Sequence, residues 1–108
     1  MEKTKGILTI FFKDAPSDEV DAILEIDDKS LQLIFKYEYD ENWTGKNIGP
    51  DLYQMNCHET DGTGEFIYRK DLKTLFGLWK EPGGEGMLSF RSNKFGEFNS
   101  QDKNADKN

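Results

Sequence analysis

The sequence has one cysteine and no long apolar run, and each shortage excludes a class of protein. The lone Cys57 has no partner for an internal disulfide or a multi-cysteine zinc site. A reducing compartment is therefore expected, and we predict a cytoplasmic protein. The apolar run from Ile7 to Phe12 spans six residues. It is shorter than the roughly 7–15 residues of a secretory signal core and the ~20 residues of a membrane span. We interpret this run as a β-strand and expect no membrane partner.

Basic residues are also scarce. Fourteen Lys and Arg residues stand against twenty-one Asp and Glu residues, which gives a formal net charge of -7 at pH 7. Nucleic acids and anionic lipid surfaces attract proteins through clustered Lys and Arg side chains. The bases of this chain are instead scattered among its acids. We expect no nucleic-acid partner, and a basic protein would match the charge better.

The sequence carries no recognisable catalytic motif. It has neither a glycine-rich phosphate loop nor a nucleophile elbow. Cys57 and His58 are neighbours, but adjacent residues of a strand point to opposite faces, so they cannot form a thiol–base pair. Cys57 is expected in the core. The acids are too numerous for a glycosidase-type pair to be identified by spacing. We therefore predict a protein without enzymatic activity, without a cofactor and without a metal site.

The sequence is rich in aromatic residues and in alternating apolar and polar runs. Eight Phe, four Tyr and two Trp residues supply a core for one domain. Short polar or glycine-bearing turns separate the runs, which indicates an all-β fold. We predict an antiparallel up-and-down meander of about seven strands in a closed or partly closed barrel. The alternative is a β-sandwich with one short helix. The predicted strands cover residues 5–13, 20–26, 31–39, 52–59, 64–69, 74–81 and 86–92.

The composition changes near the end of the chain. Residues 99–108 are polar apart from one Ala, so ordering them would cost chain entropy without burying apolar surface. We predict a single β domain over residues 1–98 and a disordered C-terminal tail over residues 99–108.

Three predicted turns agree on which side chains point to the inside of the sheet. Each is a four-residue loop, at residues 27–30, 60–63 and 82–85. The facing pairs that they predict are Leu24 with Leu33, Ala22 with Phe35, Cys57 with Phe66, Met55 with Tyr68, Trp79 with Leu88, and Gly77 with Phe90.

Two segments also fit a helix. The pattern over residues 72–79 matches helical spacing, but a strand there places Gly77 between Phe66 and Phe90, whose rings would cover the glycine. The strand is the preferred interpretation. A second short helix is possible from Ser17, with Asp18 and Glu19 in its first turn.

The meander, its inward aromatic residues and the tripeptide Gly77-Leu78-Trp79 together resemble the small calycin-type barrels, the lipocalin and avidin group. That family encloses small ligands inside a β-barrel. The resemblance covers the topology of about 85 residues. It implies a small-molecule ligand in the barrel.

The segment from Asp40 to Asp51 has the spacing of a calcium loop at several positions, with Gly45 at the sixth. Its twelfth residue is Asp51 where such loops carry a bidentate Glu, and its flanks are predicted strands. We therefore interpret it as a long polar connection between strands. Long loops in compact domains often carry function.

Five aromatic residues are the predicted ligand-binding residues. Trp43 lies in the predicted loop, where it would cap the barrel end or contact a ligand. Tyr37, Tyr53 and Tyr68 are predicted to point inward, where each buried phenol needs a hydrogen-bond partner. Trp79 is the fifth. Two functions remain: a non-catalytic binding domain for a small, partly apolar ligand, or an acidic inhibitor or immunity-type protein that binds a basic partner.

Overall fold

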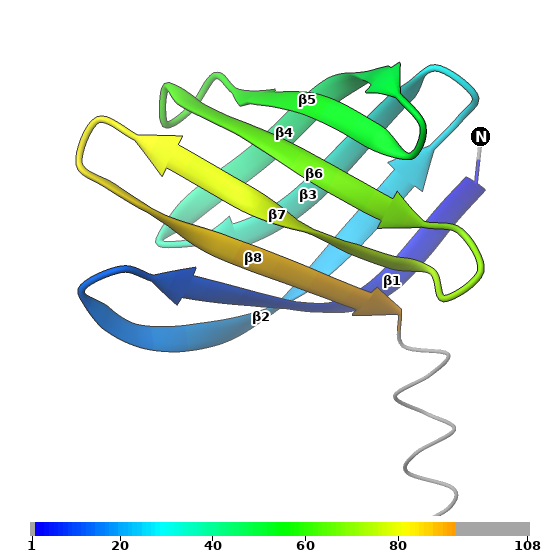
Figure 1. Ribbon diagram of the computed structural model, residues 1–108. Helices are drawn as coiled ribbons and strands as arrows, with labels where there is room; N and C mark the ends of the chain where they lie inside the picture. The colour runs from blue at the N-terminus through cyan, green and yellow to red at the C-terminus, as the bar shows by residue number, and fades with distance from the viewer. Residues whose placement is uncertain (1, 93–108) are drawn as a thin grey trace, which may run out of the picture.

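Alternating side chains produce strands along almost the whole described chain. The computed structural model describes residues 2–92, which form eight strands and no helix (Figure 1). The strands are β1 (Glu2–Phe12), β2 (Ala15–Ile26), β3 (Ser30–Tyr37), β4 (Tyr39–Gly49), β5 (Leu52–Cys57), β6 (Gly62–Arg69), β7 (Thr74–Glu81) and β8 (Gly84–Ser92). No helix in this span is long and apolar enough to cross a membrane.

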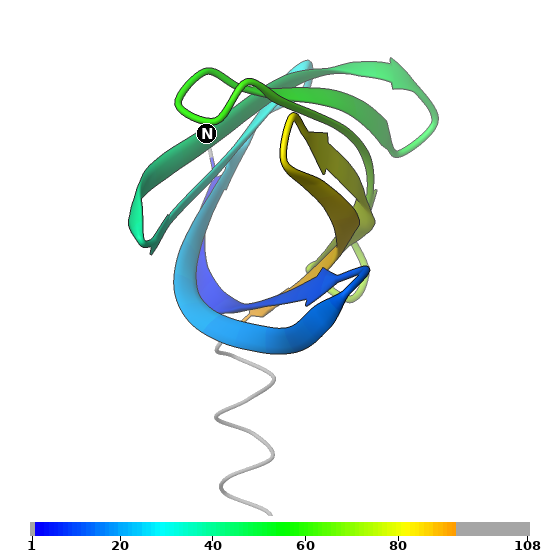
Figure 2. The same cartoon turned by 90° about the vertical axis from the view of Figure 1, so that its left-hand side faces the viewer.

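The sheet closes on itself. Each strand pairs antiparallel with the next, and β1 also pairs with β8, from Gly6 opposite Ser92 to Phe12 opposite Gly86. Figure 2 shows the strands curving round this ring. Closure removes the exposed edges that an open meander would leave. The predicted all-β antiparallel barrel is confirmed, and the sandwich with a helix is wrong for the described residues.

The predicted loop from Asp40 to Asp51 is wrong, because most of it forms β4. This strand pairs with β3 on one side and β5 on the other, which makes eight strands where about seven were predicted. The inward Glu41 and Trp43 alternate with outward polar residues. Gly45 also has a structural role, since a Cβ there would lie 2.3 Å from Met55 Sδ. The calcium-like spacing therefore lies along an extended strand.

The strand registers follow the prediction at one hairpin and differ at two. Leu24 faces Leu33 and Ala22 faces Phe35 as predicted. Cys57 faces Gly62 and Trp79 faces Gly86, where Phe66 and Leu88 had been predicted. Likewise Tyr53, not Cys57, faces Phe66, and Met55 faces Gly64 rather than Tyr68. Each strand pair is displaced by an even number of residues, so the predicted inner face is kept.

Glycine explains both displacements. A Cβ at Gly62 would lie 2.6 Å from the Trp43 ring, and a Cβ at Gly86 would lie 2.9 Å from the Trp79 ring. The Trp79 ring therefore lies against a glycine of the adjacent strand instead of opposite Leu88, and the Trp43 ring extends across Cys57 of β5 to a glycine of β6. Alternation alone does not distinguish registers that differ by two residues.

The strand interpretation of residues 74–81 is confirmed by β7, and Gly77 faces Phe66 as predicted. On the other side Gly77 faces Leu88, whereas Phe90 faces Leu75. The predicted cover of Gly77 by Phe90 is therefore wrong, and the Phe90 ring lies instead 2.6 Å from the Cβ position of Gly6. The short helix considered from Ser17 is also wrong, because β2 runs through it.

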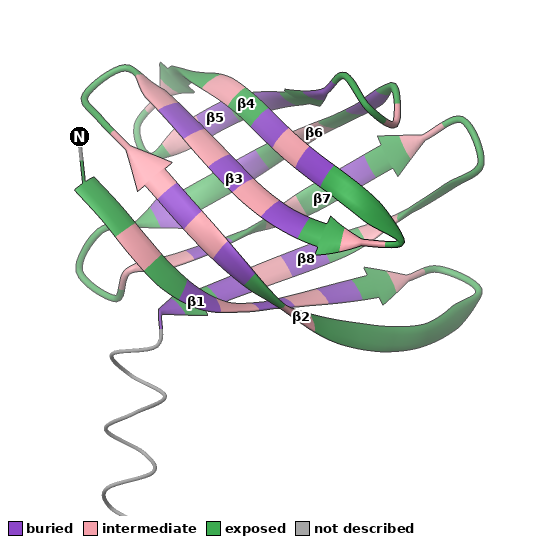
Figure 3. Cartoon of the chain, turned by 180° about the vertical axis from the view of Figure 1, so that it is seen from behind, coloured by how far each residue is buried: buried purple, intermediate pink, exposed green. Residues whose placement is uncertain are grey.

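Burial alternates along most of the strands, whereas residues 15–19 at the start of β2 are all exposed, as the colours of Figure 3 show. The inward side chains fill the barrel, as in other narrow barrels of eight strands. The core comprises Leu8, Ile10, Ala22, Leu24, Leu31, Leu33, Phe35, Trp43, Tyr53, Met55, Cys57, Phe66, Tyr68, Leu75, Trp79, Leu88 and Phe90. The predicted domain end at residue 98 and the predicted tail lie outside the described residues.

Candidate functional site

One end of the barrel contains a cavity of about 230 Å³, which we call the mouth cavity. It lies where the turns join β1 to β2, β3 to β4, β5 to β6 and β7 to β8, at the left of Figure 1. Its walls are Ile10, Phe12, Phe35, Tyr37, Glu38, Tyr39, Glu41, Trp43, Thr60, Trp79, Glu81 and Leu88. The lining is mostly aromatic and acidic.

The structure brings three of the five predicted site residues together. Tyr37, Trp43 and Trp79 all line the mouth cavity. Tyr53 and Tyr68 are buried toward the opposite end of the barrel, where the backbone N–H of Tyr68 donates to the carbonyl of Asp51 in the β4–β5 turn. Burial raises the pKa of both phenols. The five rings therefore do not form one site.

Trp43 projects inward from β4 instead of lying in a loop. It is 2% exposed, and its ring packs 5.7 Å from that of Phe66, between centroids. Its indole Nε1 donates a hydrogen bond to Glu41 Oε1 over 3.1 Å. The predicted position of Trp43 in a polar loop is therefore wrong, although its ring does lie at the barrel end.

Trp79 supplies a second indole from the opposite wall. Its Nε1 donates to the backbone carbonyl of Met87 over 2.9 Å. The Phe12 ring meets it edge-on, with 5.7 Å between centroids. Because both indole N–H groups already have acceptors, the two tryptophans present only carbon and π surface to the cavity.

Tyr37 connects the cavity to β2. Its hydroxyl donates to Asp18 Oδ2 over 2.7 Å, and this hydrogen bond raises the pKa of Tyr37. Its ring lies 5.7 Å from that of Phe12, between centroids. The carboxylate of Asp18 therefore holds the phenol at the rim.

Glu41 is the residue that the sequence did not reveal. It lies opposite Phe35, is 7% exposed and lines the mouth cavity. Burial raises the pKa of Glu41 to about 7, the Trp43 hydrogen bond opposes this rise, and the carboxylates of Glu81, Glu59 and Glu38 add to it. The sequence could have predicted this position, because Glu41 and Trp43 are two residues apart and would share the inward face of a strand. The predicted loop concealed that signal.

A second carboxylate lies next to Glu41 with the opposite behaviour. Glu59 Oε1 accepts the backbone N–H of Asn42 over 3.0 Å, and this bond lowers the pKa of Glu59. Cys57 Sγ lies 3.4 Å from the same oxygen. Two acids that are close together thus differ in their tendency to ionise, which is a common feature of functional sites.

Cys57 has the environment of a structural thiol. It is buried, and burial raises the pKa of its thiol. His58 is exposed on the other face of the chain, as predicted. A thiol with a raised pKa is a weak nucleophile at neutral pH. Among residues 2–92, no group of three or more His, Cys, Asp or Glu side chains is arranged to hold a metal ion.

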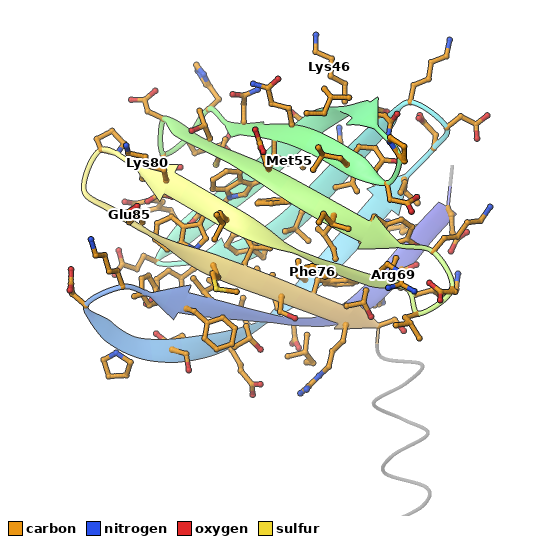
Figure 4. The ribbon with its side chains drawn as sticks, viewed as in Figure 1. Lys46, Met55, Arg69, Phe76, Lys80 and Glu85 are labelled. Carbon is orange, nitrogen blue, oxygen red and sulfur yellow. The ribbon has the colours of Figure 1, made fainter. Side chains whose placement is uncertain are left out.

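The outer wall carries a second feature, which we call the outer apolar stripe. It consists of exposed side chains on four adjacent strands: Phe11, Met87, Leu78, Phe76 and Ile67. Phe11 faces Met87, Met87 faces Leu78, and Phe76 faces Ile67. Figure 4 labels Phe76 on this side of the barrel. A more open hollow of about 630 Å³ lies over the same wall.

No family model, curated protein or solved structure matches the chain. The closed antiparallel barrel is compatible with a calycin-like fold. The mouth cavity and the outer apolar stripe are the two features from which a function follows.

Proposed function

We propose that this protein is a non-catalytic binding domain that holds a small, partly apolar molecule in the mouth cavity. The observation that carries the proposal is a cavity at one barrel end between two indole rings and a buried carboxylate. Ligand sites are typically concave and mostly apolar, with a few placed polar groups. The proposal includes membership of the calycin-type barrels and a cytoplasmic location, which the single free Cys57 supports.

The dimensions of the cavity support a small ligand. Its volume of about 230 Å³ lies just below the roughly 300–1,000 Å³ of pockets that hold drug-sized ligands. Ile10, Phe35 and Leu88 form an apolar wall, and Thr60 offers a buried hydroxyl that has no hydrogen-bond partner among the described residues. A ligand with one ring or a short chain and one polar group suits these walls.

Native mass spectrometry tests the proposal. We expect the wild-type protein, purified under mild conditions, to retain a small molecule, which then dissociates on collisional activation. Thr60→Phe places a ring at the cavity wall and should abolish retention. Leu78→Ser alters only the outer wall and should preserve it. Retention that is lost with Leu78→Ser and kept with Thr60→Phe would contradict the proposal.

The second candidate is a protein-interaction domain that binds a basic partner. The specific observation in its favour is the outer apolar stripe, because contiguous exposed apolar side chains often mark interaction sites. The net charge of -7 would speed association with a basic protein. In this case Leu78→Ser should weaken complex formation, whereas Thr60→Phe should leave it unchanged.

A further inference from the structure

We propose that the ligand of the mouth cavity is a small organic cation, namely an amine that carries one apolar ring or short chain. This inference rests on the proposed function and names the chemical class of its ligand. It follows from the charge of the lining, from the unused hydrogen-bonding capacity of one buried carboxylate, and from the rings around it.

The charge of the lining has one sign. Glu38, Glu41 and Glu81 line the mouth cavity, and no Lys, Arg or His is among its wall residues in the described chain. At the rim, Lys13 pairs with Glu85 over 3.4 Å, and Lys80 lines the outer hollows instead of the cavity. The cavity therefore has a negative potential that its own walls do not neutralise.

Glu41 lines this space and has one free acceptor. Its Oε1 accepts the Trp43 N–H, whereas its Oε2 accepts no hydrogen bond from any residue of the 2–92 span. A buried carboxylate is costly unless a proton or a counter-charge compensates it. A ligand ammonium group supplies that counter-charge and donates to the unpaired oxygen.

The rings suit the same ligand. Trp43, Trp79, Tyr37 and Tyr39 contribute to the cavity wall, and aromatic faces attract cations, most strongly those of Trp. Both indole N–H groups are occupied within the protein, so they do not serve as donors to an anion. An anionic ligand would meet acidic walls that carry no cationic side chain among the described lining residues.

An organic cation fits better than a metal ion. Calcium takes six to eight oxygen ligands, and zinc takes four. The carboxylates of the mouth cavity do not converge in groups of three or more among the described residues. One ammonium group needs only a single strong acceptor and apolar surroundings.

Isothermal titration calorimetry with three compounds of similar size tests which ligand charge the mouth cavity prefers. The probes are 2-phenylethylammonium, the neutral 2-phenylethanol and the anionic 3-phenylpropanoate, at pH 8 and low salt. We expect the cation to bind roughly tenfold or more tightly than the alcohol, since a hydrogen bond between two charged groups is stronger than one that involves a neutral hydroxyl. The anion should not bind measurably.

Two measurements tie the preference to Glu41. Glu41→Gln keeps the shape and an acceptor for Trp43, and should remove the tenfold preference for the cation. Glu65→Gln removes one negative charge from the outer surface, and this variant should retain the tenfold preference for the cation. In the wild-type protein the affinity for the cation should fall about tenfold from pH 8 to pH 5.5, as Glu41 becomes protonated. The titratable groups that face Glu41 from the packed elements are Tyr37, Glu38, Tyr39, Cys57, Glu59 and Glu81.

The outcomes separate this inference from the proposed function. If the alcohol binds as tightly as the cation and Thr60→Phe blocks both, the cavity is a binding site and the cation inference is wrong. If the anion binds best, the cation inference is also wrong. If no probe binds at millimolar concentration, or if Thr60→Phe leaves binding intact, both the cation inference and the proposed cavity site are wrong.

Discussion

At the scale of single residues, Glu41 determines the chemistry of the barrel end. Its raised pKa means that the folded protein holds a proton on this carboxyl at pH values where the unfolded chain has released it. The folded state is therefore progressively destabilised as the pH rises from about 4.5, the ordinary value, to about 7. Below that window the group contributes no penalty. Functional sites often cost stability in this way, which agrees with the proposed ligand site.

Glu41→Gln should therefore stabilise the protein at pH 8. The expected gain in unfolding free energy is about 1–3 kcal/mol. One pKa unit corresponds to ~1.4 kcal/mol, and relaxation of the structure around the charged carboxylate lowers the cost of burying it. The gain should vanish near pH 4. Urea unfolding at both pH values measures it, with Glu65→Gln as the control. A loss of stability at pH 8 would show that the ionised carboxylate is required for the fold.

At the scale of strands, glycines that lie against large rings set the register. Gly62 lies against Trp43, and Gly86 lies against Trp79. These contacts bring the two indoles to the barrel end, because a side chain at either glycine would push the ring away. The arrangement of the mouth cavity thus depends on two residues that have no side chain.

Gly62→Ala should destabilise the barrel by about 1–3 kcal/mol, the usual cost of overpacking a core. The new Cβ would lie 2.6 Å from the Trp43 ring and 2.9 Å from Thr60 Oγ1. Gly83→Ala is the matched control, since nothing lies within 4 Å of its Cβ position, and it should be neutral or slightly stabilising. Urea midpoints report both variants. Equal effects would contradict the role of Gly62 in the register.

Some strands of the barrel were predictable from the sequence and one was not. The hairpin between β2 and β3 was predictable to the residue pair, because Leu24 and Leu33 belong to uninterrupted alternating runs. β4 was missed, since its outward residues are polar and its inward ones include Glu41 and Gly45. A buried acid and a glycine break the apolar alternation that identifies a strand. The missed strand carries the two residues that define the site.

At the scale of the whole molecule, the fold class followed from the sequence and the site did not. Alternation and short turns indicate a meander whichever register is chosen, so the barrel was predictable. The mouth cavity depends on closure between β1 and β8, which brings Phe12 of β1 beside Trp79 of β7. These residues are far apart in the chain, and no local pattern indicates that they meet.

The two tryptophans allow the central claim, that the mouth cavity binds a small molecule, to be measured directly. A proton–nitrogen correlation spectrum of this protein contains two indole N–H signals, from Trp43 and Trp79. Titration with 2-phenylethylammonium or 2-phenylethanol should shift both signals together, along with the backbone amides of Glu41 and Thr60. The amides of Phe76 and Ile67 on the outer apolar stripe should not move. Shifts confined to the outer apolar stripe, or two indole signals that stay fixed at saturating probe, would contradict the account.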